Sequence, residues 1–214
     1  MFSIFVMFRK KTTMGISERK ERDKREMEKL VLDSAMTLFL EEGYKNVTIR
    51  KIAEKIEYSP ATIYLYFKDK DEILFTLQRM AFEKFHNFQA SIQSIGDPVE
   101  RLTEHGKAYV RFALENREYY ELMFLIDSPM CPNSPKDFKA EIDSYQLLKD
   151  NLKACMDAGL LKQMDIEVAA FSMWSFVHGI ASIVIKRGFL IPEDVQKYLI
   201  DGALNFLTEN YVHK

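Results

Sequence analysis

The sequence predicts an all-α protein of about nine helices, in which a short N-terminal three-helix unit precedes a larger helical bundle. Three observations lead to this prediction. Apolar residues recur at three- and four-residue spacing along most of the 214-residue chain. Strand-like alternation is scarce, and capping or breaking residues interrupt the helical pattern roughly every 10–25 residues. The 47% share of apolar residues is enough to bury a full core.

The first predicted helix covers residues 17–42, and Gly43 is expected to end it in a left-handed conformation. Its apolar stripe consists of Met27, Leu30, Val31, Ala35, Leu38 and Phe39. We expect residues 1–16 to be a disordered extension. The apolar run Phe2–Phe8 precedes its basic residues, which is the wrong order for a signal peptide, and translation could start at Met1 or at Met14.

Two short helices follow, separated by about three residues. Thr48 and Ser59 are good N-cap residues, and Pro60 suits a first helical position. The inward residues are Ile49, Ile52, Ala53 and Ile56 on the first helix and Ile63 and Phe67 on the second. This spacing is typical of a helix-turn-helix, in which one helix braces another that enters the major groove of DNA.

The outer face of the second short helix suits a nucleic acid, because its residues are small, hydroxylated or basic. They are Ala61, Thr62, Tyr64, Leu65 and Lys68, and Lys70 follows. Thr62 and Tyr64 can bond phosphates or base edges. Residues 9–70 hold 15 Lys/Arg against 11 Asp/Glu, whereas residues 71–214 hold 15 against 21. The pattern favours a DNA-binding domain at residues 17–70, with one corner of an ordinary bundle as the alternative.

Residues 71–214 are predicted to form an effector-binding and dimerisation domain of six helices. Their predicted bounds are about 69–92, 98–115, 117–126, 136–158, 165–188 and 192–211. The loop at residues 127–135 holds three of the six prolines and is the best candidate for a mobile segment. Residues 168–185 carry no charge, but they include His178, Gly179 and three serines. We interpret this stretch as a buried or interface helix, with a membrane-associated protein as the alternative.

Signs of catalysis are sparse. The four histidines are scattered, and there is no HExxH motif, Gly-rich phosphate loop or GxSxG motif. We therefore expect no catalytic site, no metal site and no cofactor; a dyad of His178 with Cys155 is the alternative. Cys131 and Cys155 lack metal-ligand spacing, and reduced cysteines suit a cytoplasmic protein.

The stretch that begins at Thr48 resembles the sequence signature of a known family. Residues 48–74, TIRKIAEKIEYSPATIYLYFKDKDEIL, together with LFLEEGYKNVTI ahead of them, resemble the TetR family of bacterial transcriptional regulators. The matching positions are Thr48, Arg50, Ile52, Ala53, Tyr64, Phe67 and Lys70. Glu57 stands where the family usually has Gly, and a left-handed Glu would cost roughly 1 kcal/mol. Trp174, His178 and Gly179 resemble the Trp-x-x-x-His-Gly segment of one C-terminal subclass.

The resemblance implies a homodimeric regulator, most often a repressor, that binds a palindromic operator in double-stranded DNA until a small effector releases it. The predicted DNA-binding residues are Thr48, Arg50, Ser59, Ala61, Thr62, Tyr64, Lys68 and Lys70. Among them, Thr48 would cap its helix and touch a phosphate, Arg50 would reach a phosphate or base, and Lys70 would hold a phosphate.

Two further predictions concern the C-terminal domain. Its large, partly polar residues suit a mostly apolar pocket for a neutral or weakly charged effector. The candidate effector-binding residues are Tyr109, Phe112, Met123, Phe124, Trp174 and His178. Residues 168–185 also have a second apolar face, which requires a partner, so we predict a four-helix homodimer interface. The residues predicted there are Met173, Phe176, Ile180, Val184, Leu199, Ala203 and Phe206.

Overall fold

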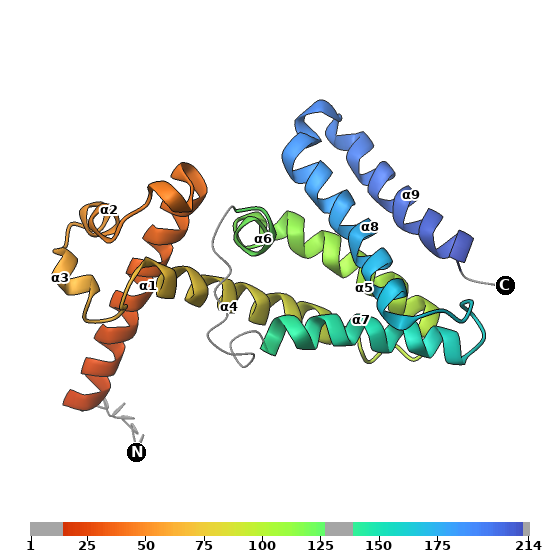
Figure 1. The fold of residues 1–214 in the computed structure, drawn as a ribbon, viewed down its shortest axis with the longest axis horizontal. Helices are drawn as coiled ribbons and strands as arrows, with labels where there is room; N and C mark the ends of the chain where they lie inside the picture. Colours follow the sequence, from red (N-terminus) through yellow and green to blue (C-terminus); the bar gives the residue numbers. More distant parts are fainter. Residues whose placement is uncertain (1–14, 127–138, 212–214) are drawn as a thin grey trace, which may run out of the picture.

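The computed structural model describes residues 15–126 and 139–211, and in that part the protein is all-α (Figure 1). The elements are α1 (Ile16–Glu42), η1 (Tyr44–Asn46), α2 (Ile49–Lys55), α3 (Pro60–Ile63), α4 (Lys70–Ala90), α5 (Pro98–Glu115), α6 (Arg117–Phe124), α7 (Lys139–Asp157), α8 (Ile166–Arg187), η3 (Gly188–Leu190) and α9 (Glu193–Tyr211). The predicted fold class is therefore confirmed. Cys131, the proline-rich loop and most of the predicted extension lie outside the described residues.

Short polar side chains begin the helices where the sequence places them. Thr48 accepts a hydrogen bond from the backbone N–H of Lys51 at 3.2 Å, and Ser59 accepts one from Thr62 at 3.2 Å. Asp69, Asp97 and Asp165 cap α4, α5 and α8 in the same way. Each cap satisfies a backbone donor that the helix itself leaves unpaired.

Glycine ends two helices. Gly43, after α1, has a φ of 78°, and Gly159, after α7, has a φ of 72°. These are conformations that other residues adopt only with strain. Both positions agree with the predicted helix ends.

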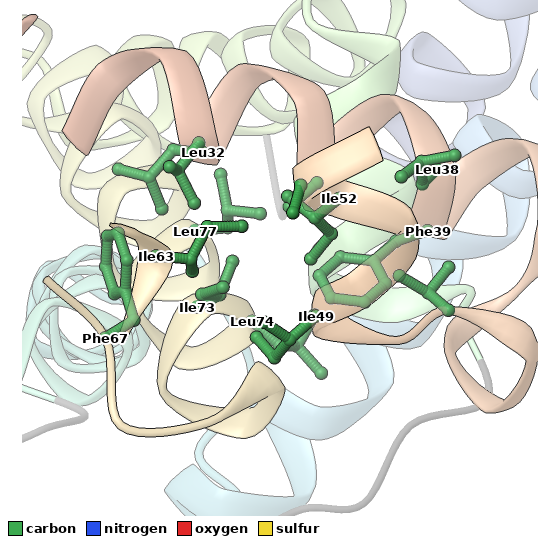
Figure 2. Close-up of a cluster of buried hydrophobic side chains, with 14 of the residues drawn as sticks. Leu32, Leu38, Phe39, Ile49, Ile52, Ile63, Phe67, Ile73, Leu74 and Leu77 are labelled. Atoms are coloured by element: carbon green, nitrogen blue, oxygen red, sulfur yellow. The ribbon is translucent and has the colours of Figure 1, made fainter. Parts of the chain in front are cut away.

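The N-terminal unit has its own core, formed by α1, η1, α2, α3 and the first turns of α4, to which Leu122 of α6 is added (Figure 2). The labelled side chains converge between the helices: Leu32, Leu38, Phe39, Ile49, Ile52, Ile63, Phe67, Ile73, Leu74 and Leu77. Leu30, which we predicted to belong to the apolar stripe of the first helix, is 40% exposed, because it lies at the edge of that stripe.

The remaining helices enclose two further clusters. One brings Phe82 and Phe85 of α4 together with residues of α5, α6, α8 and α9, and the other joins α5, α7 and α8. In Figure 1, α4 extends from the N-terminal unit into the bundle, and α8 and α9 run side by side at its far end. The helix α4 thus contributes to two cores.

In the described part of the chain, only the segment Ile166–Leu190 is long and apolar enough to cross a membrane, with a mean hydropathy of 1.8. Length and composition alone do not distinguish a membrane-spanning helix from the core helix of a soluble protein. Here α8 contacts α5, α7 and α9. Ala170 and Ala181 of α8 are fully buried in the bundle.

Candidate functional site

The first candidate site is the surface around α3. The helices α2 and α3 pack against each other through the core of the N-terminal unit, and a tight turn joins them. Within that turn Glu57 has a φ of 60°, and it is the one non-glycine residue with positive φ in the described ranges. The backbone N–H of Tyr58 donates to the Ala53 carbonyl at 3.0 Å and closes the turn. The left-handed Glu57 that we considered is therefore present.

The predicted recognition residues are exposed. Tyr64 is 57% exposed, Ala61 is exposed, and the Lys68 side chain is 87% exposed. Leu65, which the sequence also placed on this face, is 78% exposed. Ile63 beside them is fully buried, so it fixes the segment from behind. The helical conformation continues past the end of α3, because backbone N–H groups there still donate to carbonyls three or four residues back. We call α3 together with these turns the α3 segment.

Hydroxyl groups and one guanidinium flank this surface. The Thr62 and Ser59 hydroxyl oxygens lie 3.0 Å apart. The Arg50 side chain is 82% exposed and donates from Nε to Glu54 at 2.9 Å. An exposed ion pair of this kind is weak, so a DNA phosphate can compete with the carboxylate for the guanidinium.

Lys70 has a structural role besides its predicted one. Its ammonium donates to the Tyr44 carbonyl at 2.9 Å and to the Val47 carbonyl at 3.0 Å, and it lies 4.1 Å from the centre of the Tyr44 ring. The Tyr44 hydroxyl donates to Asp71, and burial together with this carboxylate raises the pKa of Tyr44. Two of the three ammonium protons are thus bonded within the fold. Lys70 therefore fastens the start of α4 to η1, while its predicted contact with a phosphate, through the third proton, stays a prediction.

The second candidate site is a cavity of about 500 Å³ within the C-terminal bundle. Helices α4, α5, α6, α7 and α8 line it, mostly with aromatic and aliphatic side chains. This size and lining are typical of a site for a small, apolar ligand.

The predicted effector residues divide into two groups. Tyr109, Phe124 and Trp174 line the cavity. Phe112 is fully buried away from it, Met123 packs against the core, and His178 lies behind Tyr109. Phe112, Met123 and His178 were therefore wrongly predicted to line the cavity, because their side chains are occupied in packing or in internal hydrogen bonds.

His178 is the centre of a closed polar cluster. Its Nδ1 lies 3.1 Å from the Tyr109 hydroxyl and 2.8 Å from the Tyr120 hydroxyl, and its Nε2 lies 3.3 Å from the Ser182 hydroxyl. The Trp174 Nε1–H donates to Tyr109 at 3.2 Å. Burial lowers the pKa of His178 and raises the pKa of both tyrosines. These polar groups satisfy one another, so they hold the cavity wall in shape.

Sequence reasoning missed Gln89 and His105, which also line the cavity. They are 2% and 4% exposed. A signal existed: Gln89 continues the four-residue row Leu77, Ala81 and Phe85 of α4, and His105 lies between Leu102 and Tyr109 on one face of α5. A polar side chain in a row of apolar ones marks a buried polar site.

The predicted dimer face also needs correction. Met173 is half-buried and lines the cavity, whereas Phe171, which was not among the predicted interface residues, is 61% exposed. Phe176 and Ile180 pack partly against the core. Val184 and Ala203 are half-buried. Leu199 and Phe206 of α9 are 47% and 59% exposed, and Ile183 of α8 is 58% exposed.

Residues 15–126 and 139–211 contain no group of three or more His, Cys, Asp or Glu side chains that could hold a metal ion. Cys155 is a free, buried thiol whose pKa burial raises to about 11, and it donates to the Pro98 carbonyl at 3.2 Å. A thiol with such a high pKa is a poor nucleophile at neutral pH.

Comparisons with known proteins agree with this arrangement. Residues 31–77 match the family described as "Bacterial regulatory proteins, tetR family", and residues 102–204 match "Tetracyclin repressor-like, C-terminal domain". The chain is 27% identical over 177 residues to the HTH-type transcriptional regulator HbdR of Aromatoleum sp. (strain CIB). This match covers 81% of this chain and 76% of HbdR.

A second relative is more similar over a shorter span. The chain is 42% identical over 141 residues to the uncharacterized HTH-type transcriptional regulator YvkB of Bacillus subtilis (strain 168), covering 63% of this chain and 70% of YvkB. The solved structure of the fatty acid degradation regulator FadR from Bacillus halodurans has a TM-score of 0.69 at 17% identity, and the match covers 85% of this chain and 94% of that one. These relatives are transcriptional regulators and not enzymes. The chain belongs to the TetR family of bacterial transcriptional regulators.

Proposed function

We propose that this protein is a cytoplasmic, homodimeric repressor that binds a palindromic operator and is released by a small, mostly apolar effector. The observation that best supports this proposal is the cavity of about 500 Å³, which lies among helices that also reach the N-terminal core. α4 and α6 contribute side chains to both cores. A ligand that changes the packing of these two helices would therefore alter how the DNA-binding units are held.

At the DNA, α3 would enter the major groove. Tyr64, Ala61 and Thr62 would meet base edges or the adjacent backbone, while Ser59, Thr48, Arg50 and Lys68 would meet phosphates. The support is that all of them except the half-buried Thr62 are exposed on the surface around α3, with the buried Ile63 behind them. The two-fold symmetry of a dimer would require two half-sites separated by about 34–36 Å, or one helical turn of DNA, or a multiple of it.

The dimer would form through α8 and α9 of each protomer. The exposed apolar residues of this surface, which we call the α8/α9 face, are Val168, Phe171, Ile183, Tyr198, Leu199 and Phe206. A Cβ added at Gly179 or Gly202 would meet nothing within 4 Å, so a partner helix has room to approach at both positions. An exposed apolar surface of this extent is typical of a protein interface.

The effector would enter the cavity, where Tyr109, Phe124 and Trp174 are candidate contacts. Because α8 carries no charge from Val168 to Ile185, we expect a neutral ligand along that wall. The Trp174, His178 and Gly179 segment further suggests the C-terminal subclass that it resembles, since Trp174 lines the cavity and His178 orders the wall behind it.

Selection of DNA from a random pool tests the proposal. The wild-type protein is expected to enrich an inverted repeat. Tyr64→Ala should weaken binding to that repeat by more than about 1 kcal/mol, because one side chain at the base edges is lost. Circular dichroism would confirm that the variant is folded. A wild-type protein that binds selected and random DNA equally well would refute the assignment of α3.

The repressor role has its own test. The selected operator is placed over the promoter of a reporter gene, and the protein is expressed with it. Reporter expression is expected to fall with the wild-type protein and to fall less with Tyr64→Ala at the same protein level. A rise in expression with the wild-type protein would show an activator.

A further inference from the structure

Gln89 is the most buried polar side chain of the cavity lining. It is 2% exposed, it lies on the last turn of α4, and the free end of its amide has no hydrogen-bond partner among the described residues. Leaving a buried amide group unpaired is costly, so such a group indicates a missing partner. Gln89 lines the cavity, but this amide atom has almost no accessible surface, so a ligand in the cavity would reach it after a small shift of the Gln89 side chain.

A chain of hydrogen bonds determines which end of the amide is free. Arg101 Nε can only donate, and it donates to Asn151 Oδ1 at 2.9 Å. The Asn151 Nδ2 amide therefore faces His105 Nδ1, at 3.1 Å, and donates to it. A neutral imidazole has one N–H, so when Nδ1 accepts a hydrogen bond the proton is on Nε2.

The last link of the chain follows from this. His105 Nε2–H must donate to the Gln89 amide, whose near atom lies 3.0 Å away. Only the amide oxygen can accept. The structure places Nε2 toward His105 and leaves Oε1 unpartnered. Because half a turn of the amide exchanges these two atoms at almost no change in shape, we assign Oε1 to the position facing His105 and the NH₂ group to the unpartnered position. Burial lowers the pKa of His105 to about 4, so the imidazole is neutral at physiological pH and the direction of the chain is fixed.

We propose that the Gln89 NH₂ group is the polar anchor of the cavity, and that it recognises an effector with an apolar body and a neutral hydrogen-bond acceptor of the carbonyl class. This inference rests on the proposed effector site and specifies the chemistry of its ligand. The acceptor would complete a chain that runs from Arg101 through Asn151 and His105 to the ligand.

The charges of the lining favour a neutral acceptor over an anion. Its two charged side chains are Glu141 and Lys149, both on α7. Lys149 donates to Glu167 at 3.0 Å, so its charge is already paired. Glu141 lies in the first turn of α7, about 15 Å along the helix from Asn151, and burial raises its pKa. A ligand carboxylate would lose its hydration for one amide donor, which is a poor exchange.

A matched pair of probes tests the assignment. Benzophenone and diphenylmethane have the same two-ring skeleton, but only benzophenone carries a carbonyl oxygen. Their dissociation constants are measured by displacement of the neutral dye N-phenyl-1-naphthylamine. Trp174 is the only tryptophan of the chain and lines the cavity, so energy transfer from it reports dye bound there. The quantity compared is the ratio of the two constants, because differences in the hydration of the probes then cancel between variants.

Two variants of Gln89 are expected to change this ratio. Gln89→Leu removes the donor, and the preference for benzophenone is expected to fall about tenfold relative to the wild type. Gln89→Met keeps the length of the side chain but has no N–H or O–H donor, so the preference should fall as far. Gln93→Leu is the matched control: its amide lies one turn further on, donates to the Gln89 carbonyl at 3.4 Å and does not line the cavity. It should leave the ratio unchanged.

Each outcome is decisive. A ratio that is the same in the wild type and in both Gln89 variants, with all proteins folded by circular dichroism, would overturn the anchor while leaving the effector site intact. Tighter binding of diphenylacetate than of benzophenone would overturn the neutral class. Failure of the dye and of both probes to bind the wild type would overturn the effector site itself and the anchor with it.

Discussion

At the scale of single residues, Glu57 is where the backbone departs furthest from what its side chain favours. Its φ of 60° is unfavourable for any residue with a Cβ, by roughly 1 kcal/mol. Glu57→Gly is therefore expected to raise the free energy of unfolding by about 0.5–1 kcal/mol in urea denaturation. Glu57→Ala keeps the Cβ and should give no such gain; equal effects of the two changes would show that the turn is not strained.

Lys70 and Lys68 form a natural pair for separating structure from DNA contact. Lys70 bonds two carbonyls of the fold, whereas the Lys68 side chain is 87% exposed. Lys70→Ala is expected to lower the free energy of unfolding by about 1–3 kcal/mol, because buried acceptors lose a charged donor. Lys68→Ala should leave stability within about 0.5 kcal/mol and instead reduce the salt dependence of DNA binding by about one unit. The reverse assignment of the two effects would contradict the structure.

His105 makes the stability of the protein depend on pH. Its pKa is about 4 in the folded chain and near 6.5 when unfolded, so between these values the unfolded chain binds more protons. Stability is therefore full above about pH 6.5 and falls on acidification, by about 1.4 kcal/mol per pH unit from this group. Urea denaturation from pH 7 to pH 5 should show a flatter dependence in His105→Gln than in the wild type. Parallel curves would mean that His105 is charged or absent from the core.

At the scale of elements, α8 presents one face to the bundle and another to solvent. Its exposed apolar residues Phe171 and Ile183 belong to the α8/α9 face, and Gly179 between them leaves space for a partner helix. Phe171→Glu is expected to convert the dimer to a monomer at micromolar concentration, measured by light scattering, because it places a charge in an apolar interface. Leu65→Glu, an equally exposed change on the α3 segment, should leave the dimer intact. A wild-type monomer would remove the interface altogether.

The ends of the helices could be predicted from the sequence, because short polar caps and glycine have local physical causes. Thr48, Ser59 and Asp69 begin their helices as expected, and Gly43 and Gly159 end theirs. These features depend only on a few neighbouring residues.

The face that each residue of α8 presents could not be predicted, because both faces are apolar. For this reason Met173, predicted at the dimer face, lines the cavity, while Phe171, not predicted there, is exposed. The cavity also depends on contacts between α4 and α7, which are far apart in the sequence, and Gln89 and His105 gain their roles only from that packing. The exposed surface around α3 was easier to predict, since α2 and α3 are neighbours along the chain.

At the scale of the whole molecule, α6 joins the two candidate sites. Leu122 is fully buried in the N-terminal core, while Tyr120, two residues earlier, is buried in the core beside the cavity. The Gln78 side chain of α4 donates to the Leu122 carbonyl at 3.1 Å, and Glu121 pairs with Lys186 of α8 at 3.1 Å. These bonds link α4 and α8 to α6. A ligand that changed the packing of these three helices would therefore be in a position to shift the DNA-binding unit.

The measurement that tests this coupling most directly is the affinity of cavity ligands with and without saturating operator DNA. The ligands are the dye and the two-ring probes, and Ser144→Phe, which adds a ring at the cavity lining, identifies by weaker binding those that bind inside it. Because coupling is reciprocal, a ligand that releases the operator must itself bind more weakly to the operator complex, by about fivefold or more. The structure predicts this weakening for ligands that enter the cavity. Equal affinities in the presence and absence of the operator, for every ligand that the cavity holds, would contradict it.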